Sequence, residues 1–255
     1  QFLNDFTKPS DNLKGRWHGL RGLCSFIMGK LYTVLSKFAE AEAEFNNSVE
    51  AYSESIWQKE RIFSRKQEST AKSGNKAGQI WDIRQEHEIS RSVALRRIGL
   101  VTSFGYAFQA LVLGNVKDAI YLSSVARGIV NWNTGKVWSA YVDLIYYSAK
   151  RAENSSNFNV LIEIKKNLER CHDIFVNLIP NGHYKNRALF QIALVNHYLA
   201  RWHKEKGQAL EKSGKRDKAL KEFKYAQDYW NEVCENLNTN INDDKLRLNK
   251  RLRSE

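Results

Sequence analysis

The chain has 255 residues, of which 40 are basic and 28 acidic, so its formal charge is +12, and 42% of its residues are hydrophobic. A chain of this length and composition buries a sizeable core and is not of the disordered class. It contains only 2 prolines and 14 glycines, whereas an all-β sandwich or barrel needs turn residues about every 8–12 positions. The composition therefore excludes an all-β fold and favours long helices joined by few loops.

The cysteines and the N-terminus indicate the compartment and the origin of the chain. Cys24, Cys171 and Cys234 are far apart and form no CxxC pair, which argues against a zinc knuckle or a disulfide framework and for a cytoplasmic protein. No signal-peptide pattern precedes them. Because position 1 is not methionine and Met28 is the only methionine, we expect a fragment of a larger multidomain protein. The uncharged stretch 98–116 contains polar residues and glycines, so we expect a buried helix there rather than a membrane span.

Apolar residues recur at helical spacing along almost the whole chain. In chain order, this spacing predicts helices over residues 12–36, 37–67, 77–113, 116–131, 136–153, 158–179, 184–212 and 216–237. The polar stretch 69–76 is the first expected loop, and Gly99 or Gly105 is expected to bend the third helix. The Pro-Asn-Gly sequence at 180–182 is the strongest break. Residues 238–255 form a basic, polar tail, in which we expect fraying or a short solvated helix.

Consecutive helices form pairs, and three of the pairs share one spacing. In each, a small residue lies 12 positions before an alanine: Gly29 before Ala41, Ala107 before Ala119, and Gly207 before Ala219. In the first and last pair, a phenylalanine (Phe45, Phe223) follows that alanine by four positions. Small residues let two crossing helices approach closely, and the large ring fills the space beside them. The spacing therefore predicts that Gly29 and Gly207 lie where paired helices touch.

This pattern resembles the tetratricopeptide repeat, whose signature is W-x2-L-G-x2-Y followed by A-x3-F. The first pair reads Met28-Gly29-x2-Tyr32 and then Ala41-x3-Phe45. The signature's tryptophan and final proline are missing, and the alanines are not spaced at the family's 34-residue period. The resemblance implies an all-α fold in which antiparallel helix pairs stack as a right-handed α-solenoid. It implies one domain over 1–237, with recognisable repeats at about 22–55, 100–133 and 200–233.

A search for catalytic or metal-binding patterns yields none. The sequence contains no HExxH, GxxxxGK[ST], GxSxG or GxGxxG, which are the signatures of common catalytic and nucleotide sites. His197 and His203 are six positions apart on one expected helix, so they diverge and cannot share a metal. We therefore expect no enzymatic activity, no metal and no cofactor.

The resemblance also implies a binding groove, because the first helix of each tetratricopeptide pair lines a concave surface. Carried onto this chain, the groove positions give these candidate binding residues: Phe26, Lys30, Phe104, Phe108, Leu111, Arg201, Lys204, Gln208 and Lys212. Such a groove is apolar in its first half and charged in its last half. It implies a scaffold or sensor module for a protein or peptide with an apolar anchor and an acidic end, together with other domains of the parent protein. The alternative that the chain's own helices cover the aromatic residues stays open.

The excess of basic residues allows a second interpretation. Lysines and arginines concentrate at 84–97, 201–224 and 245–253, which is compatible with a solvated surface or with a helical module that binds nucleic acid. No nucleic-acid-binding motif is present, so this alternative is not favoured. Salt dependence separates the two, because binding to phosphates weakens steeply with salt and binding in an apolar groove does not.

Overall fold

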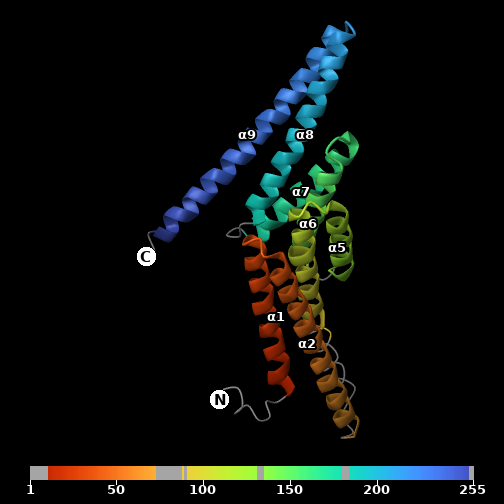
Figure 1. Ribbon diagram of the computed structural model, residues 1–255, viewed down its shortest axis with the longest axis vertical. Coiled ribbons are helices and arrows are strands. Elements are labelled where there is room, and N and C mark those ends of the chain that lie inside the picture. Colours follow the sequence, from red (N-terminus) through yellow and green to blue (C-terminus); the bar gives the residue numbers. More distant parts are fainter. Residues whose placement is uncertain (1–10, 73–87, 89–90, 131–134, 180–183, 253–255) are drawn as a thin grey trace. The chain divides into compact units, whose positions relative to one another are not determined.

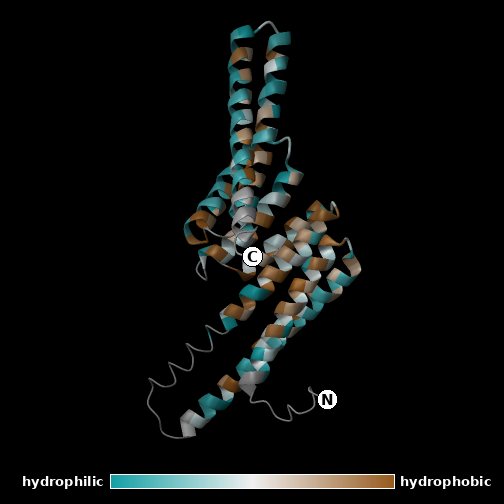
Figure 2. Cartoon of the chain, turned by 90° about the vertical axis from the view of Figure 1, so that its left-hand side faces the viewer, coloured by the Kyte–Doolittle hydropathy of each residue, from teal (hydrophilic) through white to brown (hydrophobic). Residues whose placement is uncertain are grey.

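The computed structural model describes residues 11–72, 88, 91–130, 135–179 and 184–252, and these are helical with short turns and no β-strand (Figure 1). The predicted all-α class is therefore confirmed, with neighbouring helices packed in pairs. The chain divides into two compact units, Gln1–Trp138 and Ser139–Glu255, and the single repeat domain over 1–237 stays a prediction. Each unit has its own buried core. Polar and apolar residues are mixed along the helices (Figure 2), and none of the described helices combines the length and the hydropathy that spanning a bilayer requires.

The first unit is built on two long antiparallel helices, α1 (Asp11–Val34) and α2 (Phe38–Lys72), which lie side by side in Figure 1. Their facing rows repeat every seven residues: Gly15, Gly22 and Gly29 on α1, and Ser55, Ser48 and Ala41 on α2. The Ser48 hydroxyl donates to the Gly22 carbonyl oxygen at 2.6 Å, and the Ser55 hydroxyl to that of Gly15 at 2.9 Å. A serine side chain can reach the backbone of the facing helix only where that helix has no side chain in the way, as at glycine. The glycine and serine rows therefore determine the register of the hairpin.

Phe45 fills the space beside this row and is fully buried. A β-carbon at Gly29 would lie 2.5 Å from the Phe45 ring, and one at Gly105 would lie 2.9 Å from it. The ring also meets Tyr106 edge-on at 5.5 Å and Phe26 at 6.3 Å between ring centroids. Gly29 therefore lies at the helix contact, as predicted, and glycine is required there by space.

The third predicted helix changes its hydrogen bonding where a bend was expected. Residues 91–100 are helical and continue into a π-helix, η1 (Val101–Ala107), and then α4 (Phe108–Val112). Gly105 lies inside η1 and against Phe45 of α2, so the wider helical turns include a close contact with α2. π-helical turns are rare in proteins overall, and those that do occur often lie at functional sites. After a turn at Gly114, α5 (Val116–Ile129) follows, with Ala119 and Ala107 both fully buried.

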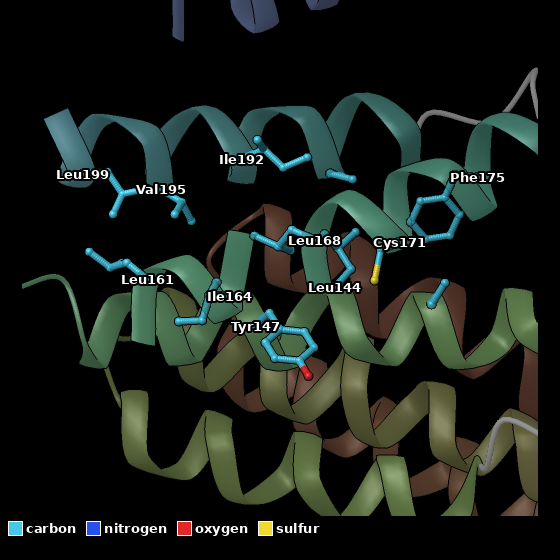
Figure 3. Packing of buried hydrophobic residues seen from close by; sticks show 12 residues of the cluster. Leu144, Tyr147, Leu161, Ile164, Leu168, Cys171, Phe175, Ile192, Val195 and Leu199 are labelled. Atoms are coloured by element: carbon cyan, nitrogen blue, oxygen red, sulfur yellow. The ribbon is translucent and has the colours of Figure 1, made fainter. Parts of the chain in front are cut away.

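The second unit contains most of α6 (Lys136–Glu153), together with α7 (Phe158–Leu178), α8 (Tyr184–Lys212) and α9 (Arg216–Leu252). Its core packs leucine, isoleucine and valine side chains of α6, α7 and α8 together with Phe175 and Tyr147, which lie toward the edges of the cluster (Figure 3). Glu232 joins α9 to this core, because one of its oxygens accepts from Asn196 of α8 at 2.9 Å and from Lys165 of α7 at 2.5 Å. These polar contacts bind three helices into one body.

The α8–α9 hairpin repeats the packing of α1–α2. Its facing rows are also seven residues apart: Asn186, Ala193, Ala200 and Gly207 on α8, and Asn240, Val233, Ala226 and Ala219 on α9. A β-carbon at Gly207 would lie 2.7 Å from the Phe223 ring. At the other end of the row, the Asn240 side-chain amide donates to the Asn186 carbonyl oxygen at 3.1 Å. The prediction that Gly207 lies at a helix contact is confirmed.

The last helix ends later than the sequence indicated. The prediction stopped it at 237 and placed a tail over 238–255, because apolar residues become scarce there. The structure continues α9 to Leu252, and the polar contact of Asn240 is joined by an ion pair between Lys185 and Asp243 at 2.6 Å. Polar contacts thus replace apolar ones along this end of the hairpin. Likewise α2 runs to Lys72, through the start of the expected loop, whose remainder lies outside the described residues.

Candidate functional site

The apolar half of the predicted groove belongs to the first unit, and there it does not form an exposed aromatic surface. Phe104 is a core residue of η1, with 5% of its surface exposed. Phe108 and Leu111 are half-buried. Phe26 packs against the Phe45 core, with the Lys30 ammonium 5.6 Å above its ring centroid. The chain's own helices therefore cover much of what the resemblance assigned to a groove.

The charged half of the prediction belongs to the second unit, and there three of the predicted residues come together. Arg201, Lys204 and Gln208 follow one face of α8 at spacings of three and four residues. They line a hollow of about 280 Å³. His197 and Glu205 of α8 and Trp230 of α9 complete its lining. Lys212 is exposed one turn further along α8 and does not line it. The hollow is slightly smaller than the ~300–1,000 Å³ typical of small-molecule sites, so it has room for one side chain or another small group.

The lining is aromatic on one side and positively charged on the other. The His197 ring meets Trp230 edge-on, with 4.8 Å between the ring centroids. The Arg201 Nε donates to a Glu205 oxygen at 2.7 Å, and this hydrogen bond, with the charge of Glu205, raises the pKa of Arg201. Both side chains are largely exposed, so water screens their pairing. Arg201 and Lys204 against Glu205 leave one net positive charge, which favours an anionic ligand group.

Sequence reasoning missed His197 and Trp230, although the register contained a signal for both. His197 lies one helical turn before Arg201 and hence on the same face of α8. Trp230 follows from continuing the seven-residue rows of the hairpin, because the partner of Ala200 is Ala226 and Trp230 lies one turn beyond it. The sequence comparison used only the glycine, alanine and phenylalanine positions and did not continue the pairing along the two helices.

A second polar cluster holds α8 and α9 together near the hollow. His203 is buried, and its Nδ1 lies 2.6 Å from a Glu222 oxygen, while the Lys206 ammonium lies 2.7 Å from the other. The rings of Phe158, Trp202, Tyr225 and Tyr229 surround the imidazole within 5.6 Å between centroids. Burial by itself raises the pKa of Glu222, but hydrogen bonds and charges from Lys206 and His203 outweigh it. That pKa therefore lies below its ordinary value of 4.5.

This pKa shift makes the hairpin sensitive to acid. A carboxylate whose pKa is depressed in the folded state stabilises the protein above its unfolded pKa, and this stabilisation is lost as pH falls through the folded pKa. Glu222→Gln should lower the free energy of unfolding by about 1–2 kcal/mol at neutral pH, because it weakens two charge-assisted hydrogen bonds. Below 4.5 the difference from the wild type should shrink. Urea unfolding at several pH values measures it, and a difference that does not change with pH would show that the Glu222 charge contributes nothing.

The chemistry of these clusters favours binding. Among the described residues, no three His, Cys, Asp or Glu side chains lie close enough to hold a metal ion. The hollow offers positive charge, an amide and aromatic surface, which can pair with anionic and amide groups. Comparison of the chain with known protein families, curated proteins and solved structures finds no match.

Proposed function

We propose that this chain is a non-catalytic interaction module that binds an acidic peptide segment of another protein. The observation that carries the proposal is the hollow on the α8–α9 hairpin, which Arg201, Lys204 and Gln208 line together with Trp230. Tryptophan and arginine are enriched at protein interfaces, and positive charge beside them favours a partner of negative charge.

Each lining residue has a distinct part in such binding. Arg201 offers two parallel N–H groups to a carboxylate, which then competes with Glu205 for them. Lys204 adds a second positive charge, and the Gln208 amide pairs with a peptide group. Trp230 supplies contact area, since a buried aromatic anchor contributes about 2 kcal/mol or more, whereas each exposed ion pair contributes about 0–1 kcal/mol. The charges therefore select an acidic segment, and the ring supplies most of the affinity.

The proposal extends to the architecture. Both long hairpins place a glycine 12 residues before an alanine, and in both the glycine touches the phenylalanine four residues after that alanine. Recurrence of one packing contact in separate hairpins supports repeats of the tetratricopeptide type, stacked as a right-handed α-solenoid. In such solenoids, exposed side chains of successive helices present an extended surface to peptides.

The test uses a fluorescently labelled peptide of alternating aspartate and leucine, with an asparagine–leucine peptide of the same length as its control. The full chain should bind the acidic peptide more tightly. Lys204→Ala should weaken binding up to about fivefold, and Trp230→Ala about thirtyfold. Lys212→Ala, outside the hollow, should leave binding unchanged. Equal binding of the two peptides, or equal loss from the Lys204 and Lys212 variants, contradicts the proposal.

The net charge of +12 makes nucleic acid the competing ligand. A single-stranded oligonucleotide is therefore titrated beside the peptide over a range of salt concentrations. Contacts to several phosphates give a steep logarithmic fall in affinity with salt, of about 0.7 per contact for single strands. Tighter binding of the oligonucleotide, with such a slope, would replace the peptide proposal with the nucleic-acid alternative.

A further inference from the structure

The outer face of α1 is a continuous apolar surface on the first unit. It consists of these residues: Trp17, Leu20, Cys24, Ile27, Leu31 and Val34. All six are exposed, from 49% for Ile27 to 79% for Val34 among those with a large side chain. Leu23, Met28 and Leu35 widen the face and are also exposed. Contiguous apolar surface on this scale marks an interaction site.

This face lies opposite the side of α1 that packs on α2. The buried side is the glycine row of Gly15, Gly22 and Gly29, whereas Cys24 lies two residues after Gly22 and hence roughly half a turn around the helix. α1 therefore presents a small-residue side to α2 and a large-residue side that is exposed. Within the described part of this unit, the large apolar side chains on the outer side are not used to form the buried core.

The spacing of the outer face matches the seam of a coiled coil. Its six residues alternate steps of three and four, the a and d positions of successive heptads, over 18 residues of helix. At a rise of 1.5 Å per residue, the seam is about 27 Å long. Such a seam is shaped to receive another helix along its whole length, with side chains of each helix inserted between those of the other.

The charges beside the seam determine which helix it fits. Between Asp11 and Glu40 the sequence contains no acidic residue. Arg16 and Arg21 occupy flanking g and e positions and are exposed, and Lys30 occupies the last g position. The other flanking positions are apolar, namely Leu23, Met28 and Leu35. In coiled coils, residues at e and g pair with opposite charges on the partner. Two copies of this face side by side in parallel would place Arg16 against Arg21, so a second copy of the chain is a poor occupant.

We propose that the outer face of α1 docks an amphipathic helix of another protein, with leucine-type side chains at its a and d positions and acidic residues at e and g. The surface shares no residue with the hollow on α8 and α9, so either can fail without the other. Docking by the helix-in-groove mode covers the apolar seam, and the arginines orient the acidic flanks of the partner.

The two exposed cysteines supply a built-in readout. Cys24 lies in the middle of the seam and Cys234 lies on α9 of the other unit, and both are exposed. The probe is a three-heptad peptide with Leu at a and d and Glu at e and g, and its control carries Lys at e and g. At saturation, the Glu peptide should slow alkylation of Cys24 by iodoacetamide at least tenfold, measured by mass spectrometry, and leave Cys234 unchanged. Equal rates at Cys24 with either peptide, or without one, overturn the proposal.

Exposed positions allow variants that leave the fold intact. Leu20→Glu and Ile27→Glu place a charge in the seam and should abolish protection of Cys24, whereas Leu220→Glu, at an equally exposed position of α9, should not. Circular dichroism checks that all three variants keep the helical content of the wild type. Sedimentation equilibrium of the wild type without peptide tests the other occupant. If the wild type is a dimer and Ile27→Glu makes it a monomer, the proposal is overturned, and the occupant of the seam is a second copy of this chain.

Discussion

Replacing Phe45 with alanine should lower the free energy of unfolding of the first unit by about 3–5 kcal/mol, the largest effect expected of any single substitution considered for this chain. The ring is fully buried and fills the space between Gly29 and Gly105, so its removal leaves a cavity bordered by two backbones. Backbones in regular helices cannot collapse into such a cavity as a flexible side chain can. The loss therefore includes the cost of the cavity as well as that of the missing apolar contact.

Urea unfolding followed by circular dichroism measures the loss, and Phe190→Ala is the matched control. Phe190 lies on α8 with 46% of its surface exposed, so the same change should cost less than about 1 kcal/mol. If Phe45→Ala and Phe190→Ala have the same effect, Phe45 is not the centre of the first hairpin.

Enlarging the glycines at the helix contacts should destabilise both hairpins. Gly29→Leu and Gly207→Leu should each cost about 1–3 kcal/mol, because even a β-carbon at these positions would overlap the Phe45 or Phe223 ring. The measurement is the unfolding midpoint of each variant in urea. The penalty has to exceed the gain in helix propensity, since leucine is intrinsically the better helix former by somewhat less than about 1 kcal/mol.

Gly128→Leu separates these two contributions. Gly128 is exposed near the end of α5, and a β-carbon there would meet nothing within 4 Å. The same substitution at this position should therefore leave stability unchanged or raise it slightly. If all three leucine variants behave alike, the loss at Gly29 and Gly207 does not come from the helix contact.

Periodicity alone was sufficient to predict most of the helices. The bounds of α6 and α8 follow the sequence prediction to the residue, because each is apolar along one face and ends at clear turn residues. The end of α9 could not be predicted in this way. Asn240 and Asp243, which lie beyond the predicted end at 237, contact α8 through polar groups, and such contacts leave no apolar period in the sequence.

The candidate site was only partly predictable, for a related reason. Arg201, Lys204 and Gln208 share one face of one helix, so spacing was enough to group them. Trp230 joins them from α9 across the hairpin, which requires the register of two helices. Phe104 was assigned to a groove from its position in a repeat, but the π-helix that contains it buries the side chain. A local change in helical hydrogen bonding is not encoded in apolar spacing.

The shared packing of glycine against phenylalanine is the central claim, and a double-mutant cycle at Gly207 and Phe223 tests it most directly. If the leucine introduced at Gly207 clashes with the Phe223 ring, removing that ring should make room for it. Gly207→Leu combined with Phe223→Ala should then be more stable than the sum of the two single losses, by about 1 kcal/mol or more. Losses that simply add, within about 0.3–0.5 kcal/mol, would show that the two residues do not touch and would contradict the register common to both hairpins.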